Sequence, residues 1–262
     1  RIGTQRDDLE PLAAGVRPAV VPLSFAQNRL WFIDQLQGPS PLYNIPVALW
    51  LRGPLDVEAL GEALADVVGR HESLRTVFPA CDGIPRQQVV AAEEADFGWE
   101  MVDATGWTED RLAEAIEQTT HHSFDLTTEI PLYAKLFRLA DDEHLFVAAA
   151  HHIAADGWSL TPLVADLSTA YACRCEGEEP GWAALPVQYA DYTLWQRARL
   201  GDLSDRESAV ASQVAFWDDL LAGLPDRLEL PTDRPYPAVA DHRGAAVAVD
   251  FPAQLQQQIR EL

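Results

Sequence analysis

The feature that most constrains the fold of this chain is the run of six apolar residues at 145–150, which leads directly into His151 and His152. A short apolar run of this kind is typical of a central β-strand that is buried on both faces. After a short loop, Ser159 precedes a segment whose apolar residues follow helical spacing, so we expect Ser159 to cap a helix. The sequence thus predicts a strand, a loop and a helix, with polar groups where the strand ends. Ligands and catalytic groups concentrate at such strand ends.

Helical and strand patterns alternate along the rest of the chain. Further helices are predicted at 24–37, 57–73, 188–200 and 207–221, from residue 108 and from residue 255. Further strands are predicted at 43–51, 86–90, 132–139 and 245–251, with an Asp82-Gly83 turn before the second of these. We expect the first helix to be substantially buried, because its apolar residues do not fit one narrow stripe. The interleaved order places the chain in the α/β or α+β class.

Breaker residues and charge mark two boundaries. Residues 1–20 have mixed charge followed by Gly15 and Pro18, which is typical of a linker. Residues 176–186 are acidic and contain Gly and Pro, so they form the best internal boundary.

The charge balance excludes several classes of partner. The chain has 19 Lys and Arg against 41 Asp and Glu, a net charge of −22. Such a chain is repelled by phosphate backbones and anionic lipid, so we expect no nucleic-acid and no membrane partner. No apolar run reaches the length of a membrane span, and residues 1–16 contain no apolar signal core, so we do not expect secretion. Three cysteines form no disulfide framework, which fits a reducing cytoplasm.

The adjacent histidines admit two interpretations. Neighbouring strand residues point to opposite faces, so only one of His151 and His152 can face a given cavity. A metal site is not expected, because no third ligand stands at a suitable spacing. The alternative to a chemical role is a hydrogen-bonded pair in the core. We assign such a structural role to His121 and His122, which lack a following Asp-Gly.

Four segments, in order, resemble the core motifs of the condensation domains of nonribosomal peptide synthetases. Residues 22–31 resemble the first motif, residues 70–78 the second, residues 151–159 the third and residues 189–195 the fourth. The third is the His-His-x-x-x-Asp-Gly active-site motif. Each motif alone is weak evidence, but four in the family's order are specific. The resemblance runs from about residue 20 to the end, and the family's fifth to seventh motifs have no counterpart.

The resemblance implies a fold of two lobes, each like chloramphenicol acetyltransferase, with the active-site motif between them in a tunnel. On this scheme, residues 1–20 are a linker and residues 21–175 form the complete N-terminal lobe. Residues 176–262 form the crossover and the beginning of a truncated C-terminal lobe. We therefore expect the 262-residue chain to be inactive on its own.

The implied activity is acyl transfer that makes a peptide bond, as in antibiotic and other secondary metabolite biosynthesis. The expected partners are upstream and downstream peptidyl carrier domains and an adjacent adenylation domain. Both substrates arrive as thioesters on phosphopantetheine arms, and the domain itself is expected to bind no cofactor. The family assigns management of the proton to the second histidine, here His152, either as a base or by positioning the amine. His151 is expected to act through folding.

The remaining motif residues receive supporting roles from the resemblance. Asp156 is expected to form an ion pair with Arg70 or Arg75 and so to hold the loop. Gly157 is expected to allow a tight turn, and its amide is a weaker candidate for contact with the oxyanion. We interpret four further motif residues as scaffold: Ser24, Arg29, Tyr189 and Trp195.

Two classes of function stay open at this point. An intact His151-His152 pair argues against a heterocyclising relative, and the residues around it resemble the subtype that joins two L-residues more than an epimerising relative. A relative that recruits a tailoring enzyme without catalysis usually has a degraded motif. The intact motif therefore favours catalysis over a non-catalytic module that docks carrier domains.

Overall fold

The computed structural model describes residues 11–225, 227–238, 247 and 249–261, which fall into two compact units. The first unit extends to Ala222 and the second begins at Gly223. In the second unit, the helix predicted from residue 255 is present as α7 (Ala253–Arg260). The strand predicted at 245–251 is wrong where the structure describes it, because residues 247 and 249–251 form no strand; residues 245, 246 and 248 lie outside the described residues. The predicted lobe boundary between residues 175 and 176 stays a prediction.

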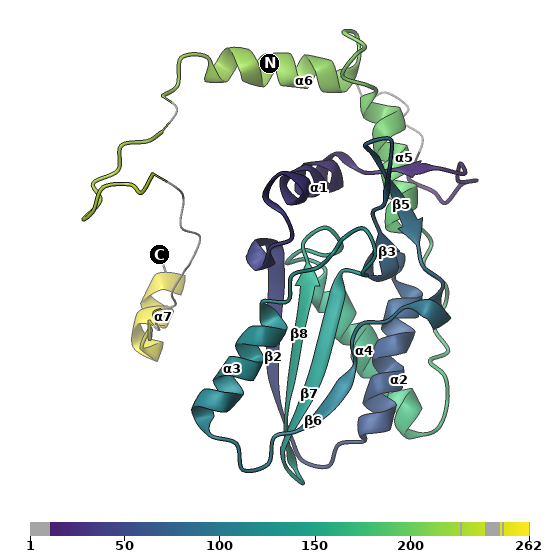
Figure 1. Ribbon diagram of the computed structural model, residues 1–262, viewed down its shortest axis with the longest axis vertical. Coiled ribbons are helices and arrows are strands. Elements are labelled where there is room, and N and C mark those ends of the chain that lie inside the picture. Colours follow the sequence, from purple (N-terminus) through teal and green to yellow (C-terminus); the bar gives the residue numbers. More distant parts are fainter. Residues whose placement is uncertain (1–10, 226, 239–246, 248, 262) are drawn as a thin grey trace. The chain divides into compact units, whose positions relative to one another are not determined.

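The first unit is built around a sheet with the strand order β2-β8-β7-β6 (Figure 1). These strands are β2 (Asn44–Arg52), β6 (Glu100–Asp103), β7 (Leu132–Ala140) and β8 (Glu143–His151). The pairs β2–β8 and β7–β8 are antiparallel, whereas β6 lies parallel to β7. Pro46 is accommodated because β2 is an edge strand.

Helices cover both faces of this sheet and bury the central strand, as the apolar run predicts. Helices α2 (Val57–Arg70) and α4 (Leu160–Cys175) cover one face, and α3 (Glu109–Thr120) covers the other (Figure 1). Phe146 and Ala148 of β8 pack in the cluster that contains the apolar residues of α2. Leu145 and Val147 pack in the cluster beside α3. This alternation explains why β8 is apolar throughout.

A second, smaller sheet lies at the carboxyl end of β8. It consists of β1 (Val21–Pro22), β3 (Thr76–Val77), β4 (Ala80–Cys81) and β5 (Ile84–Val89), with every other strand paired to β5. Asp82 and Gly83 form the hairpin turn with positive φ angles of 51° and 77°, as the sequence predicts. Helix α5 (Tyr189–Leu200) and three short 3₁₀ turns accompany this region: η1 (Pro41–Tyr43), η2 (Glu72–Arg75) and η3 (Ala92–Glu94).

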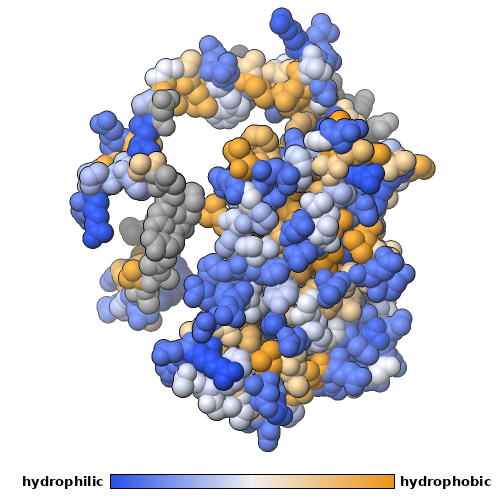
Figure 2. Space-filling model, viewed as in Figure 1, coloured by the Kyte–Doolittle hydropathy of each residue, from blue (hydrophilic) through white to orange (hydrophobic). Residues whose placement is uncertain are grey.

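Two helices bury less apolar surface than expected. Helix α1 (Phe25–Gln37) begins at a Ser24 capping box, but Phe32 and Leu36 are exposed, and Gln27 is its one buried residue. The prediction of substantial burial is wrong, because polar contacts at its first turn hold this helix. Helix α6 (Ala209–Leu221) exposes a run of apolar side chains that includes Trp217, and apolar residues are visible along it in Figure 2.

The described helices contain no stretch that is both long and apolar enough to cross a membrane.

Candidate active site

Strand β8 places the two histidines on opposite sides of the sheet's end. His151 is the last residue of β8 and stands opposite Asn44 of β2. The backbone N–H of His152 donates to the carbonyl oxygen of Tyr43 at 2.8 Å, which extends the ladder by one bond. His151 is 3% exposed, whereas His152 is an exposed residue.

His151 is a neutral core histidine. Its Nδ1 accepts a hydrogen bond of 3.1 Å from the backbone N–H of Ile153, so the proton of the neutral ring is on Nε2. The rings of Tyr43 and Phe124 lie 6.3 and 6.2 Å from its ring centroid. Burial, with a smaller contribution from the charge of His152, lowers the pKa of His151 to about 4. This geometry fits the structural role expected for His151.

The His152 side chain lines an open hollow of about 310 Å³. The other lining residues are Ala26, Arg29 and Leu30 of α1, and Tyr43. The first motif therefore faces the third across this hollow. Arg29, interpreted from the sequence as scaffold, is instead an exposed residue at the hollow, since its helix turns that side away from the core. Ser24 and Tyr189 do act as scaffold, because the buried Ser24 hydroxyl bonds the Tyr189 hydroxyl at 3.0 Å.

Asp156 fixes the loop behind the histidines through Ser159. Its Oδ1 accepts bonds from the Ser159 backbone N–H at 3.0 Å and from the Ser159 hydroxyl at 2.7 Å. The Ser159 hydroxyl also accepts from the backbone N–H of Asp156, so it does not cap α4 as predicted. These bonds, the side-chain bond first, lower the pKa of Asp156.

The predicted ion pair between Asp156 and Arg70 or Arg75 is wrong for this structure. Asp156 is exposed, which lets water and Ser159 satisfy its charge without a cation. Arg70 instead donates from Nε to Asp166 of α4 at 2.9 Å and from Nη1 to the carbonyl oxygen of Ala183 at 2.7 Å. Arg75 donates to the backbone carbonyl groups of Val90 and Gly69.

Gly157 is not required by the backbone conformation that the structure shows. It lies outside the group of glycines with positive φ, and nothing lies within 4 Å of the position of an added Cβ. The expectation that this turn requires a glycine is therefore wrong for this loop.

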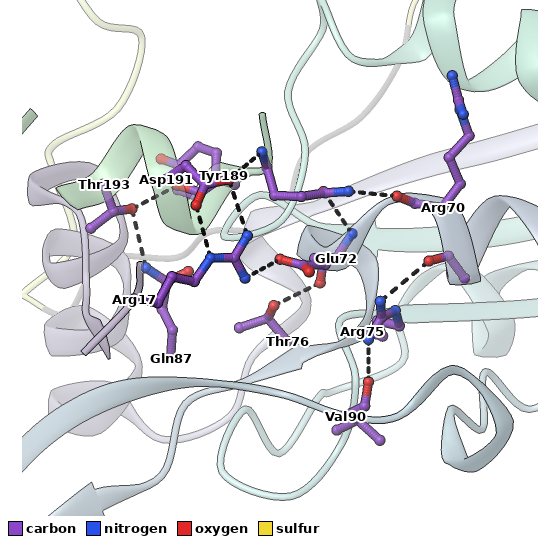
Figure 3. Close-up of polar contacts among 12 residues, drawn as sticks. Arg17, Arg70, Glu72, Arg75, Thr76, Gln87, Val90, Tyr189, Asp191 and Thr193 are labelled. Atoms are coloured by element: carbon purple, nitrogen blue, oxygen red, sulfur yellow. Dashed lines mark hydrogen bonds and ion pairs between the residues drawn. The ribbon is translucent and has the colours of Figure 1, made fainter. Parts of the chain in front are cut away.

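A partly buried polar network joins the second and fourth motifs through Arg17, a residue of the predicted linker (Figure 3). Arg17 donates two bonds to Asp191, at 2.8 and 3.0 Å, and one to Glu72 at 2.6 Å. The bonds to Asp191 raise the pKa of Arg17 and lower that of the buried Asp191. Gln188 completes the network, since its side chain donates to the Arg70 carbonyl oxygen and accepts from the Glu72 backbone N–H.

In the second histidine pair, His122 makes packing and polar contacts, whereas His121 is exposed. The ring of His122 stacks on Tyr133 at 4.4 Å and 11°, and its Nε2 lies 3.3 Å from Glu129. Two smaller hollows, of about 280 and 220 Å³, share His122 and Tyr133 as a wall. No group of three or more His, Cys, Asp or Glu residues in the described part of the chain is arranged to hold a metal ion.

Sequence reasoning missed Tyr43 and Arg17. The available signal for Tyr43 was its place at the start of the predicted strand at 43–51, but the pairing of that strand with the histidine strand is a long-range feature. Arg17 stood among the residues of a predicted linker, and no local pattern connects it with Asp191.

The fold and site define a mixed α/β domain that presents an exposed histidine, within an intact His-His-x-x-x-Asp-Gly segment, at the end of its central strand. A family model of the condensation domain matches residues 18–262, and the chain belongs to that family. The family and the mixed α/β fold predicted from the motifs are confirmed.

Similar proteins include long nonribosomal synthetases. The chain is 66% identical over 259 residues to "Isonitrile lipopeptide synthase" of Mycobacterium tuberculosis, covering 99% of this chain and 10% of that protein. It is 47% identical over 246 residues to "Dimodular nonribosomal peptide synthase" of Bacillus subtilis, covering 94% of this chain and 10% of that protein. The chain thus spans about a tenth of the length of these relatives.

Solved structures support the same fold. The X-domain in its complex with OxyB from teicoplanin biosynthesis matches with a TM-score of 0.78 and 36% identity, covering 88% of this chain and 50% of that one. The starter condensation domain of rhizomide synthetase RzmA matches with a TM-score of 0.65 and 21% identity, covering 80% of this chain and 49% of that one. The second likeness shows the fold alone.

Proposed function

We propose that the chain is the part of a condensation domain that carries the catalytic histidine and that forms peptide bonds in nonribosomal peptide biosynthesis. The observation that carries this proposal is His152, whose exposed ring lines a hollow at the end of β8 within an intact motif. The upstream substrate is an acyl or peptidyl thioester, and the downstream substrate is an aminoacyl thioester. Both are held on phosphopantetheine arms.

The reaction balances without a further reagent. The downstream amine attacks the upstream thioester carbonyl carbon, a C–N bond forms and the C–S bond breaks. The amine loses one proton, and the departing pantetheine thiolate gains one. An imidazole has an ordinary pKa of roughly 6.5, so it can accept and return this proton near neutral pH. His152 acts in this way or holds the amine in attack geometry, which itself can supply much of the rate.

The hollow and its neighbours support a division of labour between the histidines. His151 stays neutral in the core and fixes the end of β8, while His152 faces the hollow. The domain contributes no cofactor of its own in this proposal, because the carrier domains deliver the thioesters. The partners are the upstream and downstream carrier domains and an adjacent adenylation domain, in the cytoplasm.

The test is a condensation assay in the full-length synthetase with both carrier domains loaded. His152→Ala should lower the rate of peptidyl-thioester formation by about 10²–10⁴-fold, the usual contribution of a general acid or base, while carrier loading continues. His121→Ala is the matched control, since this exposed histidine lies outside the hollow. Product formation at the parental rate in His152→Ala would overturn the proposal.

A second candidate function is favoured by the likeness to the X-domain, which is the higher of the two TM-scores reported above. By this analogy the chain binds a partner protein and catalyses nothing. The same assay separates the two functions. A binding module predicts that His152→Ala leaves product formation unchanged, whereas a condensing domain predicts its loss.

A further inference from the structure

Tyr43 is the one aromatic side chain that lines the same hollow as His152. It is the last residue of η1 and stands immediately before β2. The hollow is otherwise lined by His152 and three residues of α1.

The backbone of Tyr43 is held on both sides. Its carbonyl oxygen accepts the 2.8 Å bond from the His152 N–H. The next residue, Asn44, pairs with His151 in the sheet, and its side-chain amide donates to the carbonyl oxygens of Thr120 and His122, each at 2.9 Å. These bonds tie the backbones of Tyr43 and His152 to each other and to the sheet, so the points from which the two side chains start are set before a substrate arrives.

The Tyr43 hydroxyl forms no hydrogen bond with any residue that the structure describes. The hydroxyls of Tyr189 and Tyr192, in contrast, are bonded to Ser24 and Gln196. A phenol has an ordinary pKa near 10 and is a hydrogen-bond donor at neutral pH. Tyr43 therefore lines the hollow and has an unused donor.

We propose that the hydroxyl of Tyr43 donates a hydrogen bond to the thioester carbonyl oxygen as the amine attacks. This proposal rests on the proposed function and extends it. When the C–N bond forms, the carbonyl π electrons move to oxygen, and the O–H of Tyr43 stabilises the resulting oxyanion. When the oxyanion collapses, the carbonyl bond forms again and the C–S bond breaks. The thiolate leaves and takes up the proton that the amine has lost. Tyr43 keeps its own proton throughout.

The first experiment removes only the hydroxyl. Tyr43→Phe in the full-length synthetase with loaded carrier domains should lower kcat about 10²-fold, the effect of losing one oxyanion donor, with KM changed less than threefold. Tyr192→Phe is the matched control, since it removes a hydroxyl that is bonded to Gln196 outside the hollow. A kcat within twofold of the parent in Tyr43→Phe would overturn the proposal.

The second experiment changes the acidity of the hydroxyl and leaves the ring in place. Fluorinated tyrosine introduced at position 43 has a lower phenol pKa, so the donor ionises at lower pH. We expect the alkaline limb of the kcat profile to move to lower pH in this protein, while its fold stays intact. An unchanged alkaline limb would show that Tyr43 serves packing alone.

The two proposals fail in different ways. If the parent synthetase forms no peptidyl thioester from loaded carriers, the proposed function is wrong. If the parent and Tyr43→Phe form product at equal rates while His152→Ala does not, the proposed function stands and the role of Tyr43 is wrong.

Discussion

The hollow around His152 and the network around Asp191 each combine motif residues with residues from outside the motifs, yet they differ in how their polar groups are bonded. In the network, Arg17 donates to both Glu72 and Asp191, and Asp191 is buried. In the hollow, the ring of His152 and the hydroxyl of Tyr43 are without hydrogen bonds among the described residues. The difference indicates which groups hold the fold and which are left free for chemistry.

The comparison has a physical basis. A buried charge without a partner costs several kcal/mol, so the buried carboxylate of Asp191 is paired with Arg17. Groups at an open hollow are satisfied by water, and a substrate can replace that water at little cost. Motif membership alone does not distinguish the two cases.

The largest expected effect is the loss of stability on breaking the network. Asp191→Ala should lower the local free energy of opening of α5 by about 3 kcal/mol, because Arg17 loses its two bonds to a buried carboxylate. Hydrogen exchange of the amides of residues 189–200 in the full-length protein measures this. Glu143→Ala is the control, since its pair with Arg52 is exposed and should matter by less than about 1 kcal/mol. Unchanged protection of α5 would show that the network is not structural.

The next prediction concerns the pH dependence of stability, which we expect to come from His151 and not from His152. The pKa of His151 falls from 6.5 to about 4 in the folded protein, so below pH 6.5 the unfolded chain binds a proton that the folded one does not. Stability should therefore fall by about 3 kcal/mol between pH 6.5 and 4. His151→Asn, which keeps an acceptor for the Ile153 N–H, should flatten this dependence.

The matched control for that measurement is His152→Asn. Because His152 is exposed at the hollow, this variant should keep the acid sensitivity of the parent. Hydrogen exchange of β8 at pH 7 and at pH 5 supplies the readout. Equal slopes for the two variants would mean that the core histidine does not carry the pH dependence.

Much of the architecture was predictable because the relevant patterns are local. The apolar run at 145–150 located β8, and the helical patterns at 57–73 and from residue 108 located α2 and α3. Strand β6 was missed because its four residues carry no pattern of their own. It forms through pairing with β7, where Glu100 and Asp103 bond Lys135 and Arg138.

The site was predictable only in part, for a similar reason. His152 follows from the motif, since the strand and the loop that hold it are local in sequence. Tyr43 and Arg17 reach their partners through contacts between distant segments, which no spacing rule records. The pairing of Asp156 was predicted wrongly because a hydroxyl three residues away, on Ser159, satisfies the carboxylate.

The smallest expected effect tests that last correction with double-mutant cycles. Arg70 lies 2.9 Å from Asp166, and both side chains are mostly buried, at 14% and 23% exposure. We expect a coupling free energy of about 1 kcal/mol between Arg70→Ala and Asp166→Ala, since residues in direct contact do not act additively.

For Arg70→Ala with Asp156→Ala we expect a coupling below about 0.3 kcal/mol, because Asp156 bonds Ser159 in its own loop. Both cycles are measured in the full-length protein by hydrogen exchange of α4 and of residues 152–159. A coupling of Arg70 to Asp156 as large as that to Asp166 would mean that the loop docks on the second motif. The polar groups of the loop behind His152 would then stabilise the fold, as those of the Asp191 network do. The contrast between the two regions would not extend to this loop.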